Sequence, residues 1–412
     1  MSKLQDLEFE PSLNSHLRSV GIPPSLRGFE SKARDDQAFD VAWRDGRVSD
    51  LVPVTSPVVG TLLSAMVDLH VHLDKNYTVD EVGAAHGDLS VAIERMAAKR
   101  AGWTAEALHA RMTRGLEDAW RCGTRALRTH LDWPDAPAPK SLPVLLALRE
   151  QWRNRIELQF VSLTALDRLD GHAGAVASAV AHAGGILGAF VYRNANLQAK
   201  LQRVFELAVA HDLDLDFHVD EGLDPTATGL RCIADLTTRH RWQHRVTCGH
   251  ACSLSVQPAA EAAETLRRCA SAGIHLVALP NTNLYLQGAW DGTPLERGIT
   301  RLREAAAAGV QTSIATDNVG DSFYPYGSYD LFETFGLGVQ MAHLAPVGAW
   351  LPAVTVQPAR AMRLAWDGLI RIGCPADLIV LDARTEHEML TPRGRQRTVF
   401  RNGTPIARDG TR

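Results

Sequence analysis

The stretch Val67-Asp68-Leu69-His70-Val71-His72-Leu73-Asp74-Lys75 places two histidines two residues apart at the end of an apolar run. On a β-strand, side chains at positions i and i+2 share a face, so His70 and His72 can present two neutral ring nitrogens to one cation. A catalytic site of the zinc type uses about three protein ligands and keeps a further position for water. The pair therefore predicts more ligands elsewhere in the chain, unless it is only the polar face of an edge strand.

Length and composition bound the class of protein. The chain has 412 residues, more than one compact core usually holds, which predicts one large domain with an appendage. Charged residues make up 22% and the net charge is -4, so no basic surface for nucleic acid is expected. The first residues lack an apolar signal sequence, and prolines and a glycine break the charge-free run 51–67. We expect a cytoplasmic protein without membrane segments that acts on a small molecule.

The six cysteines predict free, buried thiols rather than a disulfide framework, because nothing in the sequence indicates secretion. Cys248 and Cys252 flank a histidine, but this C-x-H-x-C spacing is not that of a zinc ribbon. The P-C-x-x-C signature of zinc-dependent nucleobase deaminases is absent from the sequence. We interpret both cysteines as core residues.

From residue 66 onward, short and continuously apolar runs alternate with helical stretches, as expected for strands that are buried on both faces. The expected strands are 66–73, 124–131, 156–163, 186–192, 213–219, 245–250, 274–279 and 310–315. The helical stretches between them include 88–121, 197–211, 259–272 and 295–308. Eight such units predict an α/β fold, a (β/α)₈ TIM barrel over residues 63–365. The β-prone flanks, 1–62 and 366–412, are expected to form one small composite β domain.

Polar side chains stand at five of the eight expected strand ends. In a barrel these ends converge at one mouth, so the groups can form a single site. The groups are His70, His72 and Asp74; His130 and Asp132; His218, Asp220 and Glu221; His250; and Asp317 with Asn318. Each has a structural reading, such as a core histidine, a helix cap or a solvated charge, but their shared placement favours a functional site.

The order of several motifs resembles the amidohydrolase superfamily, and within it the branch of cytosine deaminase and N-isopropylammelide isopropylaminohydrolase. The resemblance covers about residues 60–400. It rests on H-x-H-L-D at 70–74, R-T-H at 128–130, H-V-D-E at 218–221, V-T-C-G-H at 246–250, L-Q-G at 286–288, R-G-I-T-R at 297–301, Asp317, and Y-P-Y-G at 324–327.

The resemblance implies a metal-dependent hydrolytic deaminase that attacks the C–N bond of a cyclic amidine in a nitrogen heterocycle. It implies one divalent ion, zinc or iron with manganese possible, held by a ligand set that comprises His70, His72, His218 and Asp317. It assigns proton transfer to Glu221, places His250 beside the reacting water and counts Asp317 among the catalytic groups. Such a metal lowers the pKa of water towards about 7, which provides hydroxide for attack on the ring carbon. The segment 189–193 lacks the lysine that bridges two ions in two-metal relatives, so a second metal is not expected.

The substrate pocket is expected to differ from that of cytosine deaminase. Ala165 stands where that enzyme has a glutamine, and Asn318 replaces the second of two aspartates. The expected substrate contacts are Lys75, His130, Phe190, Tyr192, Asn283, Gln287, Asn318 and Phe323. The alternatives are a hydantoinase-like hydrolase of cyclic amides, or a catalytically idle barrel that binds a metal or ligand. We expect a homo-oligomer with no nucleic-acid partner.

Overall fold

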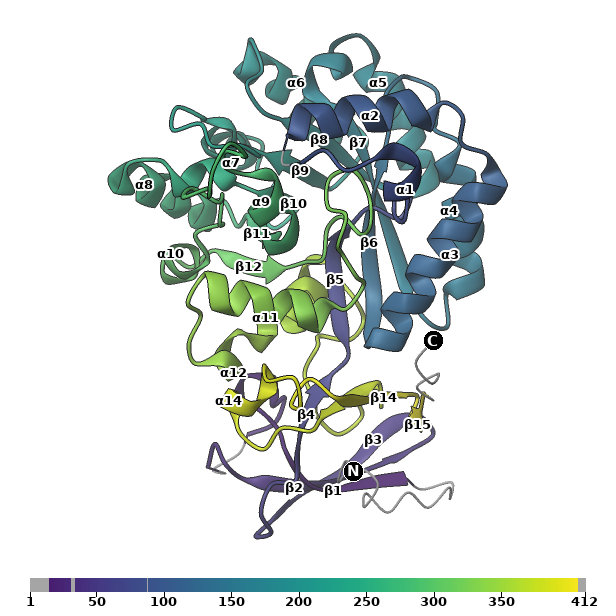
Figure 1. Ribbon diagram of the computed structural model, residues 1–412, viewed down its shortest axis with the longest axis vertical. Helices are drawn as coiled ribbons and strands as arrows, with labels where there is room; N and C mark the ends of the chain where they lie inside the picture. The colour runs from purple at the N-terminus through teal and green to yellow at the C-terminus, as the bar shows by residue number, and fades with distance from the viewer. Residues whose placement is uncertain (1–14, 31–33, 87, 407–412) are drawn as a thin grey trace.

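The computed structural model describes residues 15–30, 34–86 and 88–406, and its centre is a closed barrel of eight parallel strands (Figure 1). Neighbouring strands pair in chain order, and the last strand returns to the first through a bridge between Val71 and Asp317. The strands are β5 (Met66–Val71), β6 (Thr124–Asp132), β7 (Glu157–Ala165), β8 (Ile186–Val191), β9 (Leu215–Val219), β10 (Val246–His250), β11 (His275–Ala278) and β12 (Gln311–Ile314). The predicted TIM barrel is confirmed.

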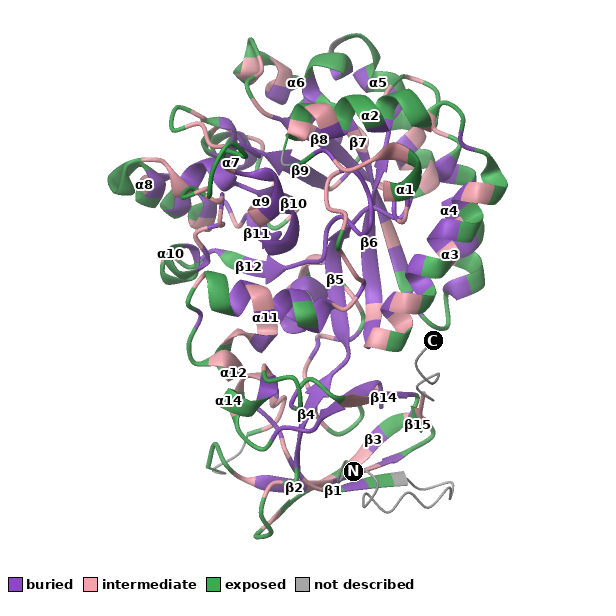
Figure 2. Cartoon of the chain, in the orientation of Figure 1, coloured by how far each residue is buried: buried purple, intermediate pink, exposed green. Residues whose placement is uncertain are grey.

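Helices surround the barrel and bury the outer faces of its strands. The main helices are α3 (Ala105–Cys122), α4 (Ser141–Trp152), α5 (Leu166–Ala183), α6 (Leu197–Ala210), α7 (Gly229–Arg239), α8 (Ala259–Ser271), α10 (Leu302–Ala307) and α11 (Leu331–Met341). Short helices are α1 (Val79–Val82), α9 (Pro280–Leu286), α12 (Val347–Trp350), α13 (Val356–Ala361) and α14 (Glu386–Met389). Figure 2 shows the consequence: the barrel strands are mostly buried, whereas the helices have exposed outer sides. Continuously apolar strands form because both of their faces are covered.

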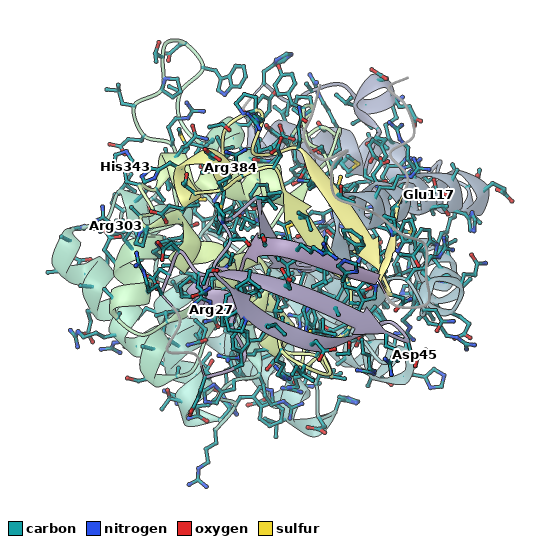
Figure 3. The ribbon with its side chains drawn as sticks, turned by 90° about the horizontal axis from the view of Figure 1, so that it is seen from below. Arg27, Asp45, Glu117, Arg303, His343 and Arg384 are labelled. Carbon is teal, nitrogen blue, oxygen red and sulfur yellow. The ribbon has the colours of Figure 1, made fainter. Side chains whose placement is uncertain are left out.

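A seven-stranded sheet lies at the opposite end of the barrel from the strand carboxyl ends. Its order is β15-β14-β13-β4-β1-β2-β3, so three strands from the end of the chain join four from its beginning through the pairing of β13 with β4. The strands are β1 (Ser15–Gly21), β2 (Ala38–Arg44), β3 (Arg47–Val54), β4 (Gly60–Ser64), β13 (Leu378–Leu381), β14 (Arg397–Arg401) and β15 (Thr404–Pro405). Seen from below, these strands lie across the bottom of the barrel (Figure 3). The predicted small β domain built from both termini is confirmed.

Two expected helices differ in extent from the prediction. The stretch 88–121 divides into α2 (Leu89–Arg100) and α3, because the Thr104 hydroxyl accepts a hydrogen bond from the Ala107 backbone N–H and starts a new helix. The stretch 295–308 is helical only over Leu302–Ala307. Gly298, within the part that is not helical, has a φ of 63°, which lies outside the right-handed helical region.

All six cysteines are free thiols, as predicted, and Cys248 and Cys252 are buried. Cys122 and Cys232 are only partly buried. Among the helices of the described chain, none has both the length and the apolarity needed to cross a membrane.

Candidate active site

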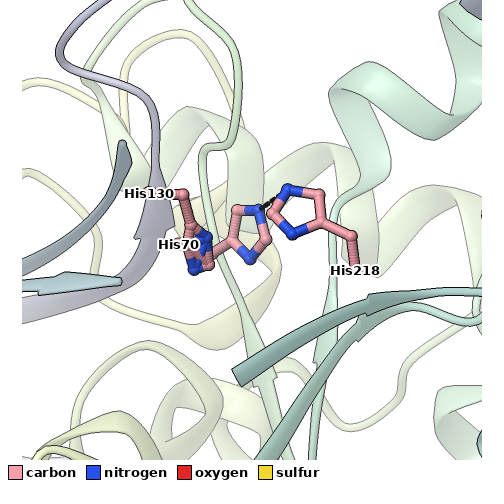
Figure 4. A group of neighbouring side chains, drawn as sticks. All are labelled: His70, His130 and His218. Atoms are coloured by element: carbon pink, nitrogen blue, oxygen red, sulfur yellow. Dashed lines mark hydrogen bonds between the residues drawn. The ribbon is translucent and has the colours of Figure 1, made fainter. Parts of the chain in front are cut away.

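Three histidines and one aspartate converge at the carboxyl ends of β5, β9 and β12. The Nε2 atom of His218 lies 3.1 Å from that of His70 and 3.3 Å from that of His72. The Oδ1 atom of Asp317 lies 3.2 Å from Nε2 of His72 and 3.6 Å from Nε2 of His70. All four side chains are buried, at 4% exposure or less. Figure 4 shows His218 turned towards His70.

These atoms fit a divalent metal ion of the zinc type. Four ligands held about 2.1 Å from a tetrahedral ion lie about 3.4 Å from one another, close to the four distances given above, which run from 3.1 to 3.6 Å. Burial, followed by the neighbouring histidines, lowers the pKa of His70 and of His218, so both rings are neutral and can offer lone pairs. Lone pairs of two neutral imidazoles repel at such a distance unless a cation or proton lies between them. The donor set is therefore chemically suited to a cation.

The backbone presents two of the site residues in a strained conformation. Asp317 has a φ of 66° and His250 a φ of 68°, a region that residues other than glycine rarely adopt. The Asp317 N–H donates to the carbonyl of His70 at 2.8 Å, which completes the closure of the barrel. Behind it, Oδ1 of Asp68 accepts a hydrogen bond from the N–H of Thr316, and burial raises the pKa of Asp68 to about 7. These contacts hold the Asp317 carboxylate at the site.

Glu221 and His250 lie beside the ligand cluster. The Oε1 atom of Glu221 is 3.4 Å from Nδ1 of His250, and that nitrogen is 3.0 Å from Oδ1 of Asn283. Burial, followed by the charge of Asp317, raises the pKa of Glu221 well above its ordinary value. Burial also lowers the pKa of His250, which keeps its ring neutral. The pair can hold and accept protons at neutral pH.

Asp220, next to Glu221, has a structural role. Its carboxylate accepts hydrogen bonds from the backbone N–H groups of Gly229 and Leu230, the first residues of α7. A carboxylate at this position satisfies free donors at the start of the helix. In the H-V-D-E motif, His218 is thus a candidate metal ligand, Asp220 caps a helix, and Glu221 lies at the site.

Lys75 lies in the cavity wall and is held by Asp132. Its Nζ is 2.6 Å from Oδ1 of Asp132, while Oδ2 of the same carboxylate is 2.7 Å from Arg100 of α2. The backbone N–H of Asp132 donates to Asp74. Burial alone would lower the pKa of Lys75, but the charges of Asp132 and Asp74 outweigh it and raise that pKa. The ammonium also lies 5.1 Å from the centre of the Phe323 ring.

Asn318 is oriented from behind by a second buried carboxylate. Its Nδ2 donates to Oδ2 of Asp321 at 2.8 Å, and Oδ1 of Asp321 accepts from the backbone of Phe323 and Tyr324. Burial raises the pKa of Asp321 to about 6. The side chain of Asn318 is therefore fixed at the strand end, with one face towards the cavity.

A cavity of about 630 Å³ opens from these groups to the surface. Its inner wall is formed by buried polar residues, namely His72, Asp74, Lys75, Asp132, His218, Glu221 and Asn318. Among the predicted substrate contacts, Lys75, Phe190, Asn318 and Phe323 line it. Ala165, where a glutamine was noted in cytosine deaminase, also lines it and is exposed. At this position, which distinguishes the chain from cytosine deaminase, the small side chain thus leaves open space in the cavity wall.

Four predicted substrate contacts are not part of this wall. His130 is fully buried below it, with its ring centre 3.8 Å from that of His70 and its Nε2 3.6 Å from Asp216. Asn283 orients His250 instead. Tyr192 packs against the backbone at Gly222, and Gln287 lies beneath Gly298. Because these four residues do not line the cavity, the structure gives no support for their predicted direct contact with the substrate.

Sequence reasoning missed the outer wall. Helix α2 contributes Leu89, Ile93, Met96, Ala97 and Arg100, and the segment after β6 contributes four residues between 134 and 139. These residues are not at strand ends, where the sequence search was directed. The spacing of the α2 residues at i, i+4, i+7, i+8 and i+11 was the available signal, since it marks one helical face.

Comparisons with known proteins place the chain in a family. A family model described as the amidohydrolase family matches residues 159–402. The chain is 37% identical over 383 residues to a pterin deaminase of Rhizobium rhizogenes, covering 90% of this chain and 88% of the relative. It is 22% identical to N-isopropylammelide isopropyl amidohydrolase of Pseudomonas sp., covering 89% and 90% of the two chains. The crystal structure of 5-methylcytosine deaminase from Klebsiella pneumoniae, liganded with 5-fluorocytosine, has the same fold, with a TM-score of 0.83, 23% identity and coverage of 96% and 98%.

The chain belongs to the amidohydrolase family, and its fold is that of 5-methylcytosine deaminase. It is a hydrolase of the class that acts on non-peptide carbon–nitrogen bonds in cyclic amidines, as the sequence predicted. The relatives support hydrolytic deamination of a nitrogen heterocycle, and the buried histidine–aspartate cluster supports a divalent metal.

Proposed function

We propose that this chain is a metal-dependent deaminase of a pterin-type ring, a fused bicyclic heterocycle whose amino group is carried by a cyclic amidine carbon. The observation that carries the proposal is the placement of Glu221 and His250 beside four converging ligand atoms, at the inner end of a large cavity. The pterin deaminase relative supports a bicyclic ring. The small side chain of Ala165 in the wall supports it as well, since it leaves room for a second ring.

His70, His72, His218 and Asp317 would hold one divalent ion, which lowers the pKa of water and so supplies a nucleophile at neutral pH. Imidazole and carboxylate donors suit zinc, iron and manganese, so the ligand set alone does not select among them. Two alternative groupings, His70–His130–His218 and His70–His250–Asp317, also have ligand atoms within 4.8 Å of one another. We favour the set of His70, His72, His218 and Asp317, because the four contacts measured among its ligand atoms are 3.6 Å or shorter.

Glu221 acts as the proton carrier. Its raised pKa keeps a proton on the carboxyl group, which can be donated to the ring nitrogen next to the reacting carbon as that carbon becomes tetrahedral. The same carboxyl can then collect a proton from the attacking water and pass it to the departing amine. Glu221 thus serves both proton transfers, and no other buried acid is needed.

His250 orients the attacking water, whose proton Glu221 collects. The amide oxygen of Asn283 can only accept, so it selects the tautomer of His250 with a proton on Nδ1. The lone pair is then on Nε2, a buried atom without a hydrogen-bond partner among the described residues. A neutral imidazole with a free acceptor nitrogen is suited to accept a hydrogen bond from the attacking water and so to orient it.

Lys75 and Asn318 bind the ring on the side of its carbonyl oxygen. Lys75 uses one donor for Asp132 and has others available to an oxygen of the substrate. The carboxamide of Asn318 can donate and accept, which suits the N–H and C=O pair of a lactam edge. These contacts favour a heterocycle that carries an oxo group near the amidine carbon.

The decisive experiment measures the products released by the metal-loaded protein from pterin, cytosine, N-isopropylammelide and a hydantoin. We expect ammonia in stoichiometric yield with the oxo product of pterin, and a lower kcat/KM for the single rings. A new carboxylate without ammonia would instead identify a cyclic-amide hydrolase. Absence of any product from fully metal-loaded protein would contradict the proposed activity.

A further inference from the structure

One face of α2 is apolar but packs only partly into the protein core, where Met96 is buried. Leu89, Ile93, Met96 and Ala97 lie on the same side of the helix and line the cavity. An apolar stripe of this kind normally faces other side chains. Here Ile93 is 43% exposed and Ala97 is exposed, although both belong to that stripe. The part of the stripe formed by Ile93 and Ala97 therefore faces the open space of the cavity.

The opposite wall of the outer cavity is also apolar. Trp103 and Leu108 reach it from the start of α3, and Leu163 and Phe190 from β7 and β8. In Figure 1, α2 crosses the ends of β7 and β8, in agreement with this shared lining. The outer cavity is thus continuous with the inner polar end and has apolar walls on two sides.

Each described cation in the lining already has a partner. Lys75 and Arg100 share Asp132, and Arg168 lies 3.8 Å from Asp135 at the mouth. The ammonium of Lys140 donates to the backbone carbonyls of Ala101 and Trp103. Three of these four cations are thus paired with a carboxylate, and Lys140, which is exposed, is held by backbone carbonyls alone.

We propose that the outer cavity is a second binding subsite, which takes an uncharged apolar substituent, such as an aryl or alkyl group, carried by the heterocycle away from its reacting carbon. This inference rests on the proposed function, because the ring must occupy the inner polar end. The total volume supports it, since about 630 Å³ is typical of a pocket for a drug-sized molecule and exceeds the needs of a lone bicyclic ring. The substituent would cover the exposed apolar stripe of α2 and remove it from water.

The test compares three ligands: the bare ring, the ring with a phenylalkyl substituent, and the ring with a carboxyalkyl substituent of similar length. We expect the phenylalkyl group to lower Kd, measured by calorimetry, and to raise kcat/KM by about tenfold, the gain expected from burying one such group. A carboxyalkyl group should give no comparable gain. Equal or greater gain from the carboxylate, or no gain from the phenyl group, would overturn the inference.

Two adjacent alanines provide a matched pair of variants. Ala97 lines the cavity, whereas Ala98 is exposed on α2 and is not part of the lining. Ala97→Phe should fill the subsite and reduce the kcat/KM ratio of the phenylalkyl to the bare ring by about tenfold. Ala98→Phe should leave this ratio unchanged, and circular dichroism checks that both variants fold. An equal loss with both variants, or none with either, would contradict the subsite.

The design separates this inference from the proposed function. Ammonia release from the bare ring without a gain from the phenylalkyl group would leave the deaminase intact and refute the subsite. Absence of ammonia from every ring would refute the deaminase. In that case the calorimetric comparison of bare and phenylalkyl rings still decides the subsite, because it measures binding without turnover.

Discussion

The ammonium of Lys75 lies 2.6 Å from Oδ1 of Asp132, and both side chains are largely withdrawn from water. The other oxygen of Asp132 binds Arg100, so one carboxylate holds a cation of the inner wall and a cation of α2. Such an arrangement keeps Lys75 charged and fixed before any ligand binds. It also links the helix that forms the outer wall to the group that we propose contacts the ring.

Asp132→Asn should destabilise the fold, because it leaves two cations near each other without their shared anion. We expect a loss of about 3 kcal/mol in the free energy of unfolding, measured in urea at pH 7. The neighbouring Asp135→Asn is a suitable control, since its contact with Arg168 is exposed at the surface. An equal effect of the two substitutions would argue against a special role for Asp132.

The same pair predicts a difference in acid stability. Burial would raise the pKa of Asp132, but Lys75 and Arg100 outweigh it and lower that pKa to about 2. A carboxyl with a lowered folded pKa stabilises the protein above its unfolded pKa of about 3.9 and loses that contribution as the pH falls towards 2. Between pH 4 and 2, wild-type protein should therefore lose more stability than Asp132→Asn, as measured by urea titrations at each pH. Parallel curves would contradict the assigned charge state.

Glu221→Gln should retain the metal and lose turnover. The amide keeps the size of the side chain but cannot carry the proton, so kcat should fall by about 10²-fold or more. Metal content is checked by elemental analysis of the purified variant, and kcat by ammonia release. A variant of full activity, or one that loses its metal, would refute the role of proton carrier.

Gly249→Ala should weaken metal binding without removing a ligand. A Cβ at this position would lie 3.1 Å from Nδ1 and from Cε1 of His70, so the ring must shift. We expect a loss of about tenfold in metal affinity, measured by competition with a chelator. Gly174→Ala is the control, because its Cβ would meet no atom within 4 Å. Unchanged affinity in Gly249→Ala would show that His70 is not a tightly held ligand.

Asn283→Leu should reduce kcat with little change in KM. The substitution removes the acceptor for Nδ1 of His250, so the ring can populate the wrong tautomer or turn. We expect about a tenfold loss in kcat, in the range of other losses of an orienting partner. A loss confined to KM would place Asn283 in ring binding, as the sequence first suggested.

The strand ends could be predicted from the sequence because buried parallel strands are continuously apolar and polar groups follow them directly. His70, His72, His218, Glu221 and Asp317 were brought together by this reasoning. The depth of a residue in the barrel could not be predicted in the same way. His130 and Asp132 share a strand face, but His130 lies two residues, or about 6.6 Å, further from the mouth and so falls below the cavity.

The role of α2 could not be read from its sequence for a different reason. An apolar helical face has the same sequence pattern whether it packs against a core or lines a cavity. Only the structure shows that Ile93 and Ala97 face open space. The tautomer of His250 likewise depends on Asn283, a residue 33 positions away that no spacing connects to it.

Strand β4 pairs with β13 and continues after a single residue into β5, the strand that carries His70 and His72. The base of this strand is therefore held by a segment more than 300 residues further along the chain. During synthesis, the first two metal-binding candidates emerge early, but their strand gains this anchor only when residues 378–381 have left the ribosome. The strand that carries His70 and His72 is thus made long before the segment that secures its base.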